Sequence, residues 1–130
     1  MSAAAPVLKP LRRRTLWLAL WAIAVLTVVV VCLIPPPPIT LPENSDKGEH
    51  FLAYFILAGS AVQLFRRGRP LLWVGLGLVL MGIGIEFAQG ALTSNRSADP
   101  MDAVANTIGV LVGLGTALSP LRDLLLRWRG

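Results

Sequence analysis

Cysteine and histidine are almost absent from this chain of 130 residues, which holds one of each, Cys32 and His50. A single cysteine excludes a disulfide within the chain and a zinc site built from several cysteines. Charged residues are also scarce, at 15% of the sequence, whereas apolar residues make up 55%. One small soluble domain cannot bury that much apolar surface in its core. The composition therefore indicates a membrane protein.

Most of the chain consists of long apolar segments. We expect four membrane spans, at about 15–34, 48–65, 71–92 and 101–118. The first has twenty residues and no charge, which matches the roughly 30 Å hydrocarbon core of a bilayer. It is too long for a cleaved signal peptide, and no A-x-A site follows it. The apolar part of the second is shorter, so we expect its helix to begin at Ser45 or Asp46, either a suitable N-cap. The sequence thus predicts an all-α integral membrane bundle of four transmembrane helices within 15–118.

The basic residues lie almost entirely in three segments. Ten of the twelve lysines and arginines fall in 1–14, 66–70 and 119–130, and the other two are Lys47 and Arg96. The positive-inside rule places such segments in the cytoplasm. We therefore predict a protein of the cytoplasmic (inner) membrane with both termini in the cytoplasm, as basic tails 1–14 and 119–130, the first of them disordered. Because the arginines lie beside helix ends, where topology and anionic lipid select for them, we expect no nucleic acid as a partner.

Polar residues gather at the predicted outer ends of the second, third and fourth spans. Many are spaced three or four residues apart, which places them on one face of a helix. Glu86 is the strongest functional candidate, because a carboxylate inside a span is costly and needs a partner. The predicted polar site comprises Asp46, Lys47, His50, Tyr54, Glu86, Gln89, Arg96, Asp99, Asp102 and Asn106.

Several of these residues also have structural interpretations. Asp46 and Asp102 could simply cap helices, and Arg96 could form an ordinary ion pair in its loop. His50 could be a general base, a pH switch or a structural partner of Glu86. His50 and the acids could bind a hard cation, but no spacing is specific for one. We therefore expect no metal and no other cofactor.

Small residues share the faces that carry these polar groups. Gly75 and Gly82 lie on the Glu86 face of the third span. The fourth span repeats small residues at four-residue spacing, at Ala105, Gly109, Gly113 and Ala117. Small residues let membrane helices approach closely, so we expect the last three spans to pack tightly and the polar groups to meet in a shallow pocket. The first span, with few polar residues, is interpreted as an anchor or a lid.

Three motifs occur in order along the chain: Asp-Lys-x-x-His-Phe at 46–51, Glu-x-x-Gln at 86–89 and Arg-x-x-Asp-x-x-Asp-x-x-x-Asn-x-x-Gly at 96–109. Together they resemble the VanZ-like family, small multi-span bacterial membrane proteins named for an accessory protein of teicoplanin resistance. The resemblance covers about residues 44–118. It implies a role at the cell envelope, but it supplies no mechanism and does not imply that this chain confers resistance.

Three classes of function fit these observations. We favour an accessory or binding protein that holds an envelope lipid, a lipid-linked precursor or a glycopeptide at the outer pocket, with Lys47 and Arg96 facing anionic groups. A membrane enzyme is the alternative, with His50 as base and Glu86 or Asp102 as acid or metal ligand, but the sequence has no clear nucleophile motif. A small transporter is the third, although the polar residues lie mainly at one end of the spans.

Overall fold

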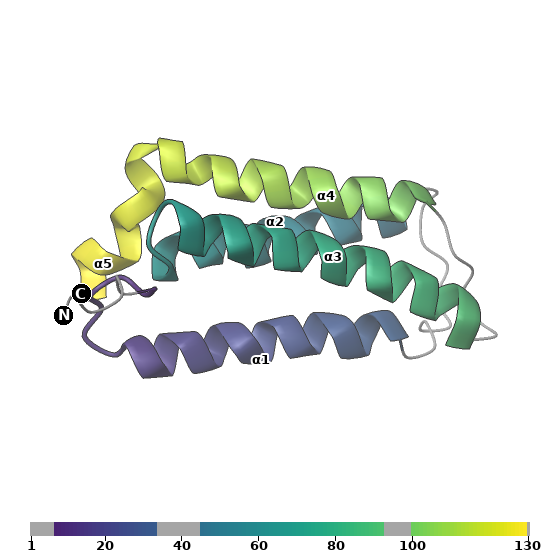
Figure 1. Cartoon of the computed structure of the whole chain (residues 1–130), viewed down its shortest axis with the longest axis horizontal. Coiled ribbons are helices and arrows are strands. Elements are labelled where there is room, and N and C mark those ends of the chain that lie inside the picture. Colours follow the sequence, from purple (N-terminus) through teal and green to yellow (C-terminus); the bar gives the residue numbers. More distant parts are fainter. Residues whose placement is uncertain (1–6, 34–44, 93–99, 130) are drawn as a thin grey trace.

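The structure is a computed structural model that describes residues 7–33, 45–92 and 100–129. These residues are helical, apart from turns and one isolated antiparallel bridge between Leu8 and Phe65. The long helices run along the longest axis of the molecule, and the short ones lie together at one end (Figure 1). The elements are α1 (Arg14–Leu33), α2 (Ser45–Leu64), α3 (Arg69–Leu92), α4 (Pro100–Gly115), η1 (Thr116–Leu118), η2 (Pro120–Asp123) and α5 (Leu124–Arg129).

Three stretches of the described helices are long and apolar enough to cross a membrane: Arg14–Leu33, Arg69–Ala88 and Pro100–Leu118. The prediction of an all-helical membrane protein is confirmed to this extent. The second predicted span, α2, is not among them, because its first two turns carry Glu49 and His50 beside other polar residues. It begins at Ser45, one of the two predicted starts.

Local signals in the sequence explain where the helices turn. Gly68 lies between α2 and α3 with a φ of 104°, a conformation that favours glycine over residues with a side chain. After η1, the Ser119 hydroxyl accepts a hydrogen bond from the Leu121 amide at 3.2 Å, and Pro120 is the first residue of η2. Serine at an N-cap followed by proline is a standard start for a helix. These turns fold the C-terminal residues back toward α2.

Helices α2 and α4 pack with their backbones in direct contact. A Cβ atom at Gly109 would lie 2.5 Å from the Phe51 carbonyl oxygen, and one at Gly113 would lie 2.8 Å from the Gly59 amide nitrogen. Real Cβ atoms do not approach other atoms so closely, so only glycine allows this packing. On α3, Gly75 provides the same kind of space for the Leu114 side chain of α4. The close packing fixes how the polar residues of α2 and α4 face each other.

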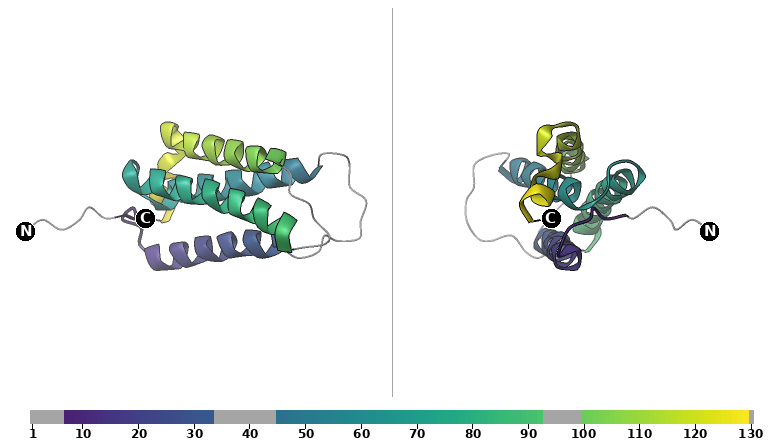
Figure 2. Two further views of the ribbon diagram at one scale, coloured as in Figure 1. Left: turned by 45° about the vertical axis from the view of Figure 1, so that its right-hand side comes forward. Right: turned by 90° about the vertical axis from the view of Figure 1, so that its left-hand side faces the viewer.

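Helix α1 packs against the outside of the other helices, and none of its residues is buried. Its indole Trp21 Nε1 donates a hydrogen bond to the Leu57 carbonyl oxygen of α2 at 3.0 Å. The Trp21 ring also meets the Phe65 ring edge to face, with 5.2 Å between centroids. The views in Figure 2 show α1 running beside the other long helices. The first apolar segment therefore belongs to the packed structure.

The segment before α1 differs from the predicted disordered tail. The Lys9 amide donates to the Leu64 carbonyl at 2.8 Å, and the Arg66 amide donates to the Val7 carbonyl at 2.8 Å. Leu11 is buried in a hydrophobic cluster. The prediction of disorder is therefore wrong from residue 7 onward, because the end of α2 leaves backbone groups that this segment pairs with.

Gln63 adds a further connection at this end. Its Nε2 donates to the Leu121 carbonyl at 2.8 Å, and its Oε1 accepts from the Leu125 amide at 2.9 Å. One side chain of α2 thus holds both η2 and α5 in place. These bonds and those of the N-terminal segment secure the end of the molecule that carries both described termini.

Candidate functional site

Tyr54, Gly82 and Asn106 meet at the centre of the candidate site, one from each of α2, α3 and α4. A Cβ atom at Gly82 would lie 3.1 Å from Asn106 Nδ2 and 3.4 Å from Tyr54 Cε1. Only 1% of Tyr54 and 3% of Asn106 are exposed. The absence of a side chain at Gly82 leaves room for both polar groups between the helices. We call these residues the inner layer.

A second set of polar residues lies one helical turn away. His50, Glu86 and Asp102 are each four residues from a member of the inner layer, which corresponds to a shift of roughly 6 Å along a helix. All three shifts go in the same direction, because α3 runs opposite to α2 and α4 (Figure 1). Glu86 and Asp102 are buried, and His50 is half-buried. We call these residues the outer layer, and the two layers together the polar site.

Glu86 of the outer layer lies near Tyr54 of the inner layer, as does Cys32 of α1. The carboxyl groups of Glu86 and Asp102 make the outer layer acidic. No group of three or more His, Cys, Asp or Glu residues in 7–33, 45–92 and 100–129 is arranged to hold a metal ion.

The buried polar atoms of the site without a hydrogen-bond partner among the described residues include Tyr54 Oη, Asn106 Oδ1 and His50 Nδ1. A buried polar atom without a partner costs roughly 1–3 kcal/mol, and native proteins leave few of them. The three atoms lie on neighbouring turns of two helices that touch each other. They are a hydroxyl oxygen, an amide oxygen and an imidazole nitrogen.

A cavity of about 200 Å³ adjoins the outer layer, between α1 and α2. Helix α2 contributes Glu49, His50 and Ala53, and α1 contributes an apolar wall that includes Val28 and Cys32. His50 is therefore shared by the cavity and the polar site. Helix α1 thus forms one wall of this region, whereas the sequence suggested an anchor or a lid.

The structure brings together five of the ten predicted site residues: His50, Tyr54, Glu86, Asp102 and Asn106. The backbones of Asp46, Lys47 and Gln89 lie in the terminal turns of α2 and α3, but their side chains are outside the described part. Arg96 and Asp99 lie outside the described residues altogether. Of the predicted packing residues, Gly109 and Gly113 contact α2, Ala105 is half-buried, and Ala117 is buried within η1.

Sequence reasoning placed Gly82 on the packing face but did not include it in the site. Its position one turn before Glu86 was the available signal, since a glycine beside a buried carboxylate leaves space for groups from neighbouring helices. Comparison of the chain with models of protein families, with curated proteins and with solved structures gives no match. The geometry of the site is therefore the basis for the proposal that follows.

Proposed function

We propose that this chain is a VanZ-like protein of the bacterial inner membrane that binds a polar part of an envelope molecule at its polar site. The ligand class is a glycopeptide or a lipid-linked precursor of the envelope. The observation that carries the proposal is the pair of buried atoms Tyr54 Oη and Asn106 Oδ1, which lack partners among the described residues. A ligand hydroxyl or amide between them would supply the missing hydrogen bonds.

The proposal includes four membrane spans. Helix α2 is the one that is not apolar enough to be recognised as a span by its composition. Its apolar half exposes large side chains such as Leu52 and Ile56 on the outside of the protein, as a lipid-facing helix does. Its polar face turns Tyr54 toward Gly82 of α3 and Asn106 of α4, and His50 lines the cavity between α1 and α2. Polar residues inside a membrane protein usually face the protein interior or a water-filled cavity, so these residues are compatible with a spanning helix.

The orientation in this proposal follows from charge. The basic residues of 1–14, 66–70 and 119–130 lie at the end opposite the polar site, and the positive-inside rule assigns that end to the cytoplasm. The polar site then faces the extracytoplasmic side, where precursors of the envelope and glycopeptides are found. An acidic outer layer suits the hydroxyl, amide and ammonium groups of such molecules.

The direct test compares cells with the wild-type chain, a deletion, and the separate variants His50→Ala and Glu86→Gln. Membrane level and topology are measured first, followed by susceptibility to teicoplanin and to other envelope stresses. We expect both variants to insert normally and to behave like the deletion. The matched control is Thr107→Val, because this hydroxyl is next to Asn106 but donates to the Ala103 carbonyl of its own helix at 2.8 Å.

The control variant should behave like the wild type. If His50→Ala and Glu86→Gln also behave like the wild type at normal membrane levels, the polar site only holds the helices together and the proposed function is wrong.

A further inference from the structure

A second pocket, of about 360 Å³, lies at the opposite end of the molecule. Four basic residues line it, Lys9, Arg66, Arg67 and Arg122, and Asp123 is its one acidic residue among those described. The remaining lining is largely apolar and comes from the ends of α2, α3 and the C-terminal helices, including Phe65 and Leu71. The pocket combines a basic rim with a buried apolar floor, and we call it the basic pocket.

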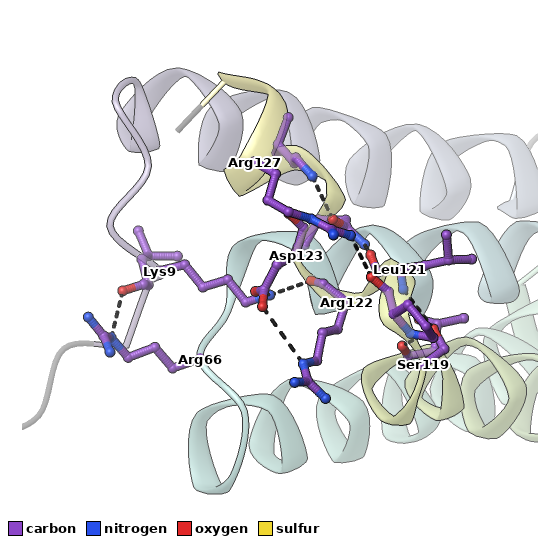
Figure 3. A network of polar contacts seen from close by, with 12 residues as sticks. Lys9, Arg66, Ser119, Leu121, Arg122, Asp123 and Arg127 are labelled. Carbon is purple, nitrogen blue, oxygen red and sulfur yellow. Dashed lines mark hydrogen bonds and ion pairs between the residues drawn. The ribbon is translucent and has the colours of Figure 1, made fainter.

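The N-terminal segment forms one side of the basic pocket. Lys9 Nζ donates to Asp123 Oδ1 at 2.8 Å and also to the Arg122 carbonyl oxygen. Arg66 Nε donates to the Leu8 carbonyl oxygen at 3.1 Å. Figure 3 shows Arg66 beside the backbone of this segment and Arg122 beside the Lys9–Asp123 pair. The pocket is thus assembled from three parts of the chain that are far apart in sequence.

The basic pocket has an excess of positive charge. Lys9 and Asp123 neutralise each other, and Arg122 Nε is 3.7 Å from Asp123 Oδ2, beyond hydrogen-bond distance. The pocket thus holds three guanidinium groups, those of Arg66, Arg67 and Arg122, and one carboxylate, which already pairs with Lys9. Guanidinium groups bind phosphate oxygens well, since several N–H donors point the same way.

Arginine and tryptophan side chains line another pocket at this end of the molecule. A pocket of about 310 Å³ is lined by Arg12, Arg13, Trp17, Trp128 and Leu16. Tryptophan is enriched where a protein crosses the membrane–water interface. Arginine beside tryptophan is typical of the level of lipid headgroups, and the apolar floor of the basic pocket suits a ligand that continues into hydrocarbon.

We propose that the basic pocket binds the phosphate headgroup of an anionic phospholipid. The positive-inside rule explains the sign of the charge at this end, but it does not explain why three arginines surround one pocket with an apolar floor. The proposal does not depend on the function proposed for the polar site, which lies at the other end of the helices.

The chain offers a matched pair of variants for the test. Arg67 and Arg69 are both exposed and lie two residues apart, but only Arg67 lines the basic pocket. Binding of phosphatidylglycerol and of phosphatidylcholine to the purified full chain is measured by native mass spectrometry. Glycerol phosphate is the soluble phosphate probe.

We expect tighter binding of phosphatidylglycerol than of phosphatidylcholine or glycerol phosphate. Arg67→Gln and Arg122→Gln should each weaken phosphatidylglycerol binding about five-fold, the usual effect of one basic residue near anionic lipid. Arg69→Gln should leave it within about two-fold of wild type. Equal losses in Arg67→Gln and Arg69→Gln would overturn the proposal, because the attraction would then be unspecific. Binding of glycerol phosphate as tight as that of the lipid, or no preference for the anionic lipid, would overturn it as well.

Discussion

The two ends of this molecule differ in whether their polar side chains have hydrogen-bond partners. At the end that carries α5, Lys9 and Asp123 pair with each other, and both amide atoms of Gln63 are hydrogen-bonded. At the other end, Tyr54 and Asn106 are more deeply buried, yet each has a polar atom without a partner among the described residues. The first arrangement stabilises the fold. The second has an energetic cost that a bound ligand would remove, which is why we place the binding site there.

The polar site depends on the contact between α2 and α4, because these helices carry Tyr54 and Asn106. Gly109→Ala would bring a methyl group to 2.5 Å from the Phe51 carbonyl oxygen, which is backbone and cannot move aside easily. We expect the free energy of unfolding to fall by about 3 kcal/mol, the upper part of the usual range for overpacking. Thermal unfolding of the purified protein in detergent measures this effect, the largest that we predict.

The control for this prediction is Gly77→Ala. Among the described residues, no atom beyond its chain neighbours and its own helix backbone lies within 4 Å of a Cβ placed there, and helix propensity alone favours alanine. The control should therefore be as stable as the wild type or slightly more stable. Equal stability of Gly109→Ala and Gly77→Ala would show that α2 and α4 are not in backbone contact.

At the end that carries α5, removing one member of the Lys9–Asp123 ion pair should lower the stability of the protein. The Lys9 side chain is 10% exposed and that of Asp123 is 40% exposed. Asp123→Asn leaves the Lys9 ammonium without its carboxylate, and we expect a loss of about 1 kcal/mol, since solvent partly screens this pair. The double variant Lys9→Met, Asp123→Asn should recover most of the loss, because it removes the buried charge as well. Simply additive losses in the double variant would contradict the pairing.

The same pair predicts a dependence on pH. The hydrogen bond from Lys9, together with the positive charges of Lys9, Arg122 and Arg127, holds the pKa of Asp123 below its ordinary value of 3.8. The unfolded chain therefore binds this proton first as the pH falls. The contribution of the pair to stability is complete well above pH 3.8 and is lost as the pH drops through the lowered pKa of the folded protein.

The measurement is the difference in unfolding free energy between the wild type and Asp123→Asn across this range. The difference should shrink toward zero in acid and be constant from about pH 5 upward. A difference that grows as the pH falls would show that the pKa of Asp123 is not lowered.

Much of the fold could be predicted because apolar length and helix-end signals are local. A proline follows the first apolar segment at position 35 and the last one at position 120. Helices α1 and α4 end a few residues before these prolines. The docking of the N-terminal segment could not be predicted. Lys9 pairs with Asp123, which is 114 residues away in the sequence. A single pair at such a separation produces no periodic pattern from which the contact could be predicted.

The polar site was partly predictable for a similar reason. Helical spacing places His50 with Tyr54 and Asp102 with Asn106, so each pair could be assigned to one face. Spacing alone does not say how one helix is rotated toward another. The close approach at Gly82 and the wall formed by α1 depend on that rotation, and they became visible only in the three-dimensional arrangement.

The smallest change in stability should come from the residue that matters most for the proposed function. Tyr54→Phe keeps the buried ring and removes a hydroxyl that has no partner among the described residues. We expect the free energy of unfolding to stay the same or to rise by up to about 1 kcal/mol, because an unsatisfied polar group is removed. If the hydroxyl is instead held by protein groups, its loss should be destabilising.

The most direct test of the proposed function therefore measures Tyr54→Phe twice, with Thr107→Val as the control. Unfolding is followed in detergent, and susceptibility to teicoplanin and other envelope stresses is followed in cells. The proposed function predicts a variant at least as stable as the wild type that nevertheless behaves like the deletion. A variant that is less stable than the wild type but protects cells just as well would show that the hydroxyl is structural and that the polar site binds no ligand.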